Sequence, residues 1–250
     1  MPDKAASKPD LVEKRPPGTK ILRPRDAATL VIVDRSGNEP KVLMGKRRAD
    51  LVFMAGMYVF PGGRVDRTDK SVPVADDLRA GEIAKLQVGM RGLPTPTRAR
   101  ALAAAAVREA FEEAGLVIGR PAANTKEAPD GWKTFFATGH APSLSGMTFF
   151  ARAETPPGRP RRFDTRFFCV DAAAIAERHQ ISDGELSALD WLTLDGARAI
   201  DLPRITRVVL EDLSEQLADG SLDHGTNPVP YYYQRNGVSK RDLITPNCRS

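Results

Sequence analysis

The segment VREAFEEAG, residues 107 to 115, places three glutamates and one arginine within nine positions. A helix turns by about 100° per residue, so Glu109, Glu112 and Glu113 project from one face of a helix built from this segment. Like charges at this spacing cost roughly a few tenths of a kcal/mol, and a bound cation reverses the sign of that cost. Because magnesium and manganese prefer oxygen ligands, the segment is a candidate site for one of these ions.

The alternative is a solvated helix face on which Arg108 and Glu112 pair one turn apart. The stretch FPGGRVD, residues 60 to 66, favours the metal site over this alternative. Its consecutive glycines, Gly62 and Gly63, follow a short apolar run and allow the backbone to approach a charged group closely.

Several elements must position these residues. The runs AATLVIVD (27–34) and KVLMGKR (41–47) flank a Gly/Asn/Pro turn, a pattern that predicts a β-hairpin. Thr95 can cap a helix that continues through residue 114, with Pro96 at its first position and Gly115 just past its end.

Farther along, strand-like and helix-like segments alternate without a regular βαβ rhythm. Strands are expected in GMTFFARAE (146–154), TRFFCVDA (165–172) and ALDWLTLD (188–195). Residues 205 to 220 have an apolar face at helical spacing and end in a glycine, as an amphipathic helix does. The order predicts an α/β domain with a mixed β-sheet.

The chain is expected to form one domain over residues 25–225, preceded by a flexible N-terminal arm (1–24). Residues 70–94 are interpreted as an irregular insertion with a short helix near 76–87. We expect that the insertion can be shortened without loss of the metal site. Residues 226–250 are expected to form a mostly irregular C-terminal tail.

Composition excludes several classes of protein. The hydrophobic content of 41% supports a core, and no apolar run approaches the length of a membrane span. The N-terminal residues lack the apolar segment of a secretory signal, and two cysteines are too few for a disulfide framework, so a cytoplasmic location is expected. The net charge of +5 comes from scattered basic residues without a nucleic-acid-binding motif. That charge fits either a solvated surface or the attraction of an anionic small molecule.

The glycine pair and the later REAFEEAGL together resemble the signature of the Nudix hydrolases. In that signature five residues separate a glycine from a glutamate, and seven more separate that glutamate from Arg-Glu-apolar-x-Glu-Glu-x-Gly-apolar. The matching positions of this chain are Gly63, Arg108, Glu109, Ala110, Glu112, Glu113, Gly115 and Leu116. The resemblance implies the Nudix fold, an α/β/α sandwich around a mixed sheet.

Two positions depart from the signature. Asp69 stands where the family has its first glutamate, and residues 70 to 107 replace the usual spacer of seven. Loop-closure cost grows only logarithmically with length, so such an insertion is tolerated if its ends meet. The signature is called the box below. A box interrupted in this way, and the stretch FMAGMYVFPGGRVD (53–66), are similar to the coenzyme A diphosphatase branch of the family. Val52 occupies the place of a second arginine, five residues after Arg47, that this branch often carries.

The resemblance assigns roles to the box residues. Glu109, Glu112 and Glu113 would bind Mg²⁺ or Mn²⁺, and Gly63 would contribute its carbonyl oxygen. Arg108 would orient the glutamates. The general base would be either Glu109 or a late acidic residue, for which Glu185 is preferred over Asp183.

The function implied is hydrolysis of the pyrophosphate bond of a nucleoside diphosphate derivative. Coenzyme A or acyl-coenzyme A is the first candidate substrate, giving 3′,5′-ADP and 4′-phosphopantetheine. Arg47, Arg161 and Arg162 are candidates for binding phosphate. The alternatives are a pyrophosphatase for ADP-ribose, NADH or dinucleoside polyphosphates, and a non-catalytic Nudix-like binding module.

No nucleic-acid or membrane partner is expected, while a homodimer is compatible with the sequence. The tyrosines at 231 to 233 lie in the C-terminal segment beside two prolines. They either stack on an adenine base or pack the tail or a dimer interface.

Overall fold

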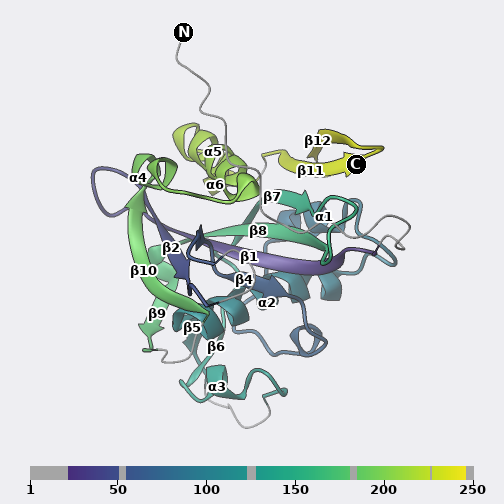
Figure 1. Cartoon of the computed structure of the whole chain (residues 1–250). Helices are drawn as coiled ribbons and strands as arrows, with labels where there is room; N and C mark the ends of the chain where they lie inside the picture. The colour runs from purple at the N-terminus through teal and green to yellow at the C-terminus, as the bar shows by residue number, and fades with distance from the viewer. Residues whose placement is uncertain (1–21, 51–54, 123–127, 181–184, 226, 246–250) are drawn as a thin grey trace.

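A mixed β-sheet divides the molecule into two helical layers (Figure 1). The computed structural model describes residues 22–50, 55–122, 128–180, 185–225 and 227–245. One layer contains the longest described helix (Pro96–Ala114), and the other contains the helices between residues 194 and 224. This is the α/β/α sandwich that the sequence predicts.

Within the described residues, the larger sheet has nine strands. Its main path runs in the order β10-β2-β1-β8-β7-β11-β12, with β3 added to β2 and β4 added to β1. In chain order these strands are β1 (Arg25–Asp34), β2 (Lys41–Arg47), β3 (Tyr58–Val59), β4 (Gly62–Arg64), β7 (Thr148–Glu154), β8 (Phe163–Asp171), β10 (Leu186–Thr193), β11 (Val229–Arg235) and β12 (Val238–Ile244). A smaller sheet joins β6 (His140–Pro142), β5 (Leu116–Pro121) and β9 (Ile175–Arg178).

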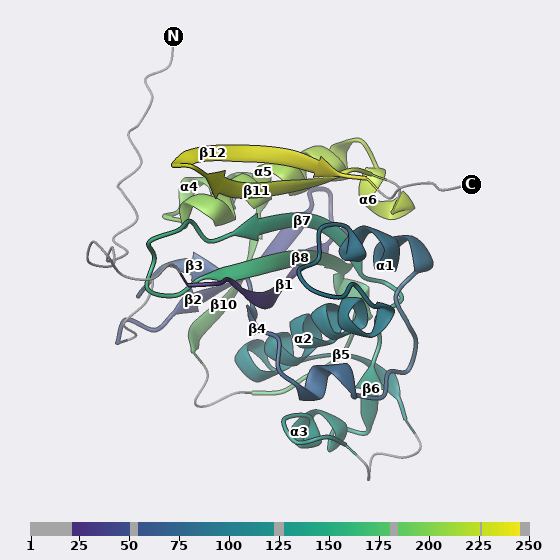
Figure 2. The ribbon, with the colours of Figure 1, turned by 90° about the vertical axis from the view of Figure 1, so that its right-hand side faces the viewer.

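The helices lie on both faces of the larger sheet (Figure 2). One layer holds α1 (Ala80–Gln87) and α2 (Pro96–Ala114), with α3 (Lys133–Phe136) beside the smaller sheet. The other layer holds α4 (Leu194–Ala199), α5 (Arg204–Ala218) and α6 (Ser221–His224). Two single 3₁₀ turns, η1 (Thr68–Lys70) and η2 (Ala172–Ala174), complete the described elements.

The strand β1 runs through the middle of the sheet and pairs in parallel with β8 from Arg25 to Val33. Its side chains alternate between two apolar cores, as the pleat of a strand requires. Leu30 and Ile32 face the α2 layer, whereas Val31 belongs to the core under α5. Since β11 also pairs in parallel with β7 and the other pairs are antiparallel, the sheet is mixed.

The expected β-hairpin and the box helix are both confirmed. β1 and β2 pair antiparallel around the turn, and α2 begins and ends where the sequence predicts. The Thr95 side chain accepts the Arg98 N–H at 3.2 Å, and Gly115 ends the helix with a left-handed φ of 67°. These signals are local, and each satisfies backbone groups that a helix end leaves unpaired.

The insertion is not the dispensable irregular segment that the sequence suggested. Its helix α1 lies within the expected range, but Leu78 and Leu86 are only 5% and 1% exposed and belong to the core beneath α2. Glu82 is buried as well, accepts the Phe149 N–H at 2.8 Å and pairs with the buried Lys85 at 3.0 Å. Replacing residues 70–94 by a linker would therefore expose part of the core.

The expectation of an irregular C-terminal tail is also wrong. Residues 229 to 244 form the hairpin β11–β12, and β11 extends the larger sheet by pairing with β7. Val229 and Ile244 are buried. Residues 246–250, and residues 1–21 of the proposed arm, lie outside the described residues. None of the helices in the described segments is long and apolar enough to cross a membrane.

One carboxylate fastens the insertion to the rest of the fold. Asp76 accepts the N–H groups of Leu144 and Ser145 at 2.8 and 2.7 Å, and Arg120 and the Ser143 hydroxyl bond to its other oxygen. Partial burial acts to raise the pKa of Asp76, but these hydrogen bonds outweigh it and lower the pKa to about 2.

Asp76→Asn should therefore lose stability in a pH-dependent way. A pKa lowered from about 3.9 in the unfolded chain contributes about 2 kcal/mol above pH 4, and this contribution disappears as the pH falls toward 2. We expect urea unfolding to show a gap between wild type and variant at pH 7 that narrows at pH 2.5. The control is Asp130→Asn, whose carboxylate is 87% exposed, and which should change little. An equal gap at both pH values would contradict this role for Asp76.

Candidate functional site

The candidate site forms where the strand β4 meets the last turns of α2, which lie side by side in both views (Figure 1 and Figure 2). β4 pairs with β1, with Gly63 opposite Ala28. A Cβ atom on Gly63 would lie 2.5 Å from the carboxyl carbon and both oxygens of Glu109. The absent side chain therefore lets Glu109 rest directly on the strand.

The second glycine of the pair binds a second glutamate. The Gly62 N–H donates to Oε2 of Glu113 at 3.0 Å. A Cβ atom on Gly62 would meet the Ala28 carbonyl oxygen at 2.6 Å, so a larger residue would displace β4 from β1. The two glycines thus fix the positions of two of the three box carboxylates.

Arg108 forms ion pairs with two of the box glutamates. Its side chain is 5% exposed and contacts Glu109 and Glu112 at 2.9 Å each through Nη1. Its Nη2 donates to the Arg64 carbonyl oxygen at 2.9 Å, which joins α2 to the end of β4. Arg108 thus contacts two of the three glutamates that it was expected to orient, and one of these contacts is the Arg108–Glu112 pair of the alternative interpretation.

Asp69, the residue in place of the first signature glutamate, anchors Arg108. Its carboxylate is fully buried and receives Nε and Nη2 of Arg108 at 2.9 and 3.2 Å. The Asp66 N–H and the Trp132 indole N–H also donate to it, at 2.7 and 3.0 Å. Trp132 is a residue that the sequence interpretation missed, because nothing near it in the chain points to the box.

Two further predicted residues come together next to Glu113. Arg47, at the end of β2, pairs with Glu185 at 2.9 Å, and Glu185 immediately precedes β10. Both act on the pKa of Glu113, Glu185 raising it and Arg47 lowering it. Asp183, the other late acidic residue considered, lies outside the described residues.

Burial dominates the electrostatics of the box. Desolvation raises the pKa of Glu109 to about 7, against the opposing effect of Arg108. It raises the pKa of Glu113 to about 8, although the Gly62 N–H acts in the other direction. Desolvation also raises the pKa of Glu112. The fold thus holds three carboxylates in surroundings that disfavour their negative charge.

These residues fit a hard divalent cation in kind. The donors are oxygens, and the Gly63 position leaves room that a side chain would fill. Burial raises the pKa of Glu109 and Glu113, and a bound cation would favour their charged forms. Among the described residues, no three His, Cys, Asp or Glu side chains are gathered as a ready metal site. The reason is visible in the contacts: Glu109 and Glu112 turn to Arg108, and Glu113 turns to Gly62.

The arginines between β7 and β8 have other surroundings. Arg162 is buried and donates to the carbonyl oxygens of Leu22 and Thr155, at 2.6 and 2.9 Å, and to Glu154 at 2.7 Å. It therefore holds the chain together and is not available to a phosphate. Arg161 is exposed and lines a groove that contains none of the box residues.

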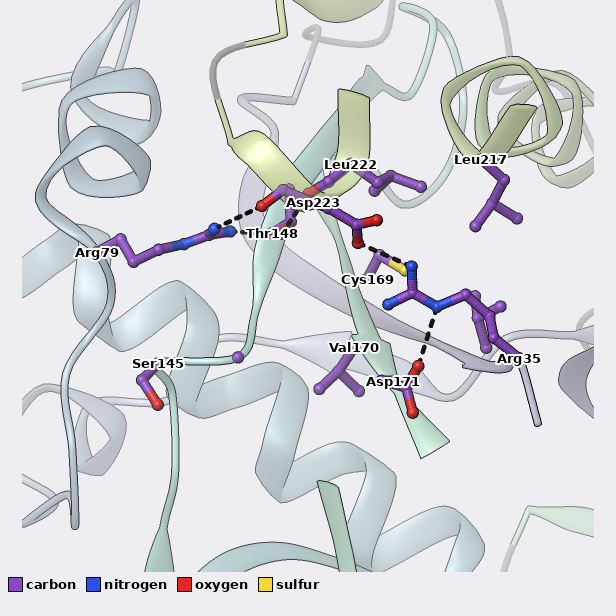
Figure 3. Close-up of a pocket in the computed structure, with 12 residues that line it drawn as sticks. Arg35, Arg79, Ser145, Thr148, Cys169, Val170, Asp171, Leu217, Leu222 and Asp223 are labelled. Atoms are coloured by element: carbon purple, nitrogen blue, oxygen red, sulfur yellow. Dashed lines mark hydrogen bonds and ion pairs between the residues drawn. The ribbon is translucent and has the colours of Figure 1, made fainter. Parts of the chain in front are cut away.

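A small cavity of about 120 Å³ beneath α6 is lined by ion-paired side chains (Figure 3). Arg35 bridges Asp171 and Asp223 at 2.9 and 2.7 Å across it. Arg79, from the insertion, donates to the Thr148 hydroxyl at 2.6 Å. These contacts attach α6 and the insertion to the sheet.

No family model matches the chain. It is 28% identical over 186 residues to a protein of Caenorhabditis elegans named "Putative nudix hydrolase 7", a match that covers 67% of this chain and 51% of that protein. The chain thus spans about half the length of the curated relative it matches. A crystal structure of a Nudix hydrolase from Alicyclobacillus acidocaldarius has a TM-score of 0.55 and 28% identity, over 76% of this chain and 90% of that chain.

Sequence similarity, structural similarity and the box geometry agree. The chain has the Nudix fold, and it is similar to Nudix hydrolases in sequence and in structure.

Gly63→Ala tests the contact between β4 and the box helix. The added Cβ would lie 2.5 Å from the Glu109 carboxylate and must displace it. A displacement of about 1 Å should lower the rate of diphosphate hydrolysis by about 10². Gly81→Ala is the matched control, because a Cβ at Gly81 of α1 meets open space. It should leave kcat unchanged and stabilise its helix slightly. Unaltered activity in Gly63→Ala would show that this contact is not needed.

Glu113→Gln tests the proposed metal site. It keeps the shape of the side chain and its acceptor for the Gly62 N–H but removes one negative charge. We expect kcat to fall by about 10² or more and folding to be nearly unaffected. Thermal unfolding with and without Mg²⁺ should show stabilisation of the wild type and little or none of the variant.

Glu177→Gln is the control for this measurement, since Glu177 is 46% exposed on β9 and pairs with His179. Its response to Mg²⁺ should equal that of the wild type. A normal kcat for Glu113→Gln at saturating Mg²⁺ would remove Glu113 from the site.

Proposed function

We propose that this chain is a metal-dependent diphosphatase that cleaves the pyrophosphate bond of a nucleoside diphosphate derivative, with coenzyme A or acyl-coenzyme A as substrate. The observation that carries the proposal is the packing of the α2 carboxylates against the glycine pair of β4. Evenly solvated surface glutamates would need neither the glycines nor the buried arginine at their centre.

The chemistry requires neutralisation of negative charge. A pyrophosphate is an anion that repels hydroxide and other nucleophiles. Glu109, Glu112, Glu113 and the Gly63 carbonyl oxygen would hold Mg²⁺ or Mn²⁺, which when bound supplies positive charge at the phosphate oxygens and makes water a better nucleophile. Arg108 would keep the glutamates in place, since it contacts two of them and is itself fixed by Asp69.

A carboxylate must take the proton of the attacking water. Glu185 suits this role, because its side chain is 54% exposed and can pass the proton on to solvent. Its pairing with Arg47 at 2.9 Å would orient its carboxylate. Glu109 is the alternative base, although its side chain is only 14% exposed and lies against Arg108 and Gly63.

The substrate is inferred from charge. Coenzyme A carries a 3′-phosphate in addition to its pyrophosphate, so it is more negative than ADP-ribose. A chain of net charge +5, with Arg47 beside the box, favours the more highly charged ligand. ADP-ribose, NADH and dinucleoside polyphosphates are the alternative substrates. The three helix glutamates are all kept, which argues against a non-catalytic binding module.

The test is a substrate panel. Purified full-length chain is incubated with each candidate diphosphate in Mg²⁺ and in Mn²⁺, and products are identified by phosphorus NMR. We expect 3′,5′-ADP and 4′-phosphopantetheine from coenzyme A, with no turnover after chelation of the metal. Absence of hydrolysis across the panel, with folded protein and either metal, would favour the binding module.

The 3′-phosphate distinguishes the substrates. We expect kcat/KM to be higher for coenzyme A than for its 3′-dephospho form, and the difference to shrink as salt screens the charges. Equal or faster turnover of dephospho-coenzyme A, NADH or ADP-ribose would exclude the coenzyme A assignment and leave the diphosphatase activity standing.

A further inference from the structure

A second and larger cavity lies on the other face of the sheet from the box helix. It is a groove of about 360 Å³ between the first turn of α5, the adjoining ends of β7 and β8, and the hairpin β11–β12. This volume falls within the range of small-molecule binding sites, about 300–1,000 Å³.

The floor of the groove is apolar. Phe163 and Phe167 contribute from β8, and Ile205 and Val208 contribute from α5. Farther along α5, Val209 and Leu213 are fully buried, whereas Ile205 and Val208 are only half-buried. The apolar face of α5 is thus longer than the surface that covers it, and its uncovered end faces the groove.

The rim of the groove is basic. Arg161, Arg204 and Lys240 line it and are exposed, and they come from a loop, a helix and a strand that are distant in sequence. α5 begins at this rim, and no side chain caps its first turn, so the positive end of the helix dipole adds charge of the same sign.

The carboxylate that lines the groove does not offset this charge. Glu154 already pairs with Arg162 at 2.7 Å and with Arg91, and it accepts the Tyr231 hydroxyl at 3.1 Å. One wall is rigid as well, because the Tyr232 hydroxyl is held by both carboxylate oxygens of Asp212 on α5, at 2.8 and 2.9 Å. A preformed wall lowers the entropy cost of binding.

We infer that this groove binds a small amphipathic organic anion, with an apolar acyl or aromatic body on the floor and a carboxylate or phosphate group at the basic rim. The site is distinct from the box, because Thr165 and Phe167 of β8 point toward α5 while the box helix packs on the opposite face. Guanidinium groups suit such an anionic group, since they donate two parallel hydrogen bonds to a carboxylate or phosphate.

Binding can be measured with a fluorescent probe of this chemistry, 1-anilinonaphthalene-8-sulfonate, on the folded full-length chain without metal. We expect one saturable site per chain, displaced by octanoate and by octyl phosphate. Neither inorganic phosphate nor octanol should displace the probe at the same concentrations, since phosphate lacks an apolar body and octanol lacks an anionic group.

Two variants test the residues. Arg161→Ala combined with Arg204→Ala should weaken probe binding by about tenfold, and Val208→Glu should abolish it. Lys133→Ala is the matched control, because Lys133 is 72% exposed on α3, away from the groove, and its loss should change nothing. Thermal unfolding of each variant confirms that it is folded.

The outcome is independent of the proposed diphosphatase activity. Glu113→Gln should bind the probe as the wild type does, so an inactive box leaves this inference intact. Absence of saturable binding, or equal affinity in the double arginine variant, would overturn it. So would sedimentation showing that Val208→Glu separates a dimer, because a second copy of the chain would then occupy the groove.

Discussion

The buried ion pair between Arg108 and Asp69 is the constraint on which the site depends. The two residues lie on opposite sides of the insertion in sequence, yet both side chains are almost wholly buried and bond through two nitrogens and two oxygens. Removing one partner of such a pair leaves an uncompensated charge in the interior, at a cost of about 3–5 kcal/mol. Because Arg108 also contacts Glu109 and Glu112, the pair transmits the position of η1 to the carboxylates.

The arginine content has a structural explanation as well. A scattered basic composition suggested solvated charges or contacts with an anionic ligand, but Arg152, Arg162 and Arg166 are buried. Arg152 pairs with Asp164 at 2.8 Å and donates to the carbonyl oxygens at the end of α1, which secures the insertion to the sheet. Planar guanidinium groups with several donors can satisfy a carboxylate and a backbone oxygen together, which lysine does less well.

Sequence reasoning succeeded where the signal is local. Thr95, Pro96 and Gly115 mark the two ends of α2, and two strand-like apolar runs around a turn identify the hairpin of β1 and β2. The sequence singled out Arg47 and Glu185 separately and did not predict that they pair, since the strand pairing of β2 with β10 that brings them together is long-range.

The misses have one physical cause. Glu82 and Lys85 look like the polar face of a surface helix, and only the packing of α1 against α2 and β7 reveals that they are buried partners. Trp132 joins Asp69 across a gap in sequence that no periodicity spans. The tyrosine-rich C-terminal segment contains prolines and lacks clean alternation, so its role as sheet strands depends on the neighbouring β7.

The parallel pairing of β1 with β8 has a consequence for synthesis. β1 ends at Asp34, whereas its parallel partner β8 begins only at Phe163. Until β8 has been made, the edge of β1 that pairs with it has no partner, while β2 and β4 pair with β1 along its other edge. Contacts between distant segments form slowly, and uncovered strands aggregate in the meantime. An unpaired edge of this strand can meanwhile pair with another chain, so the long sequence separation of β1 and β8 gives aggregation an opportunity before the sheet closes.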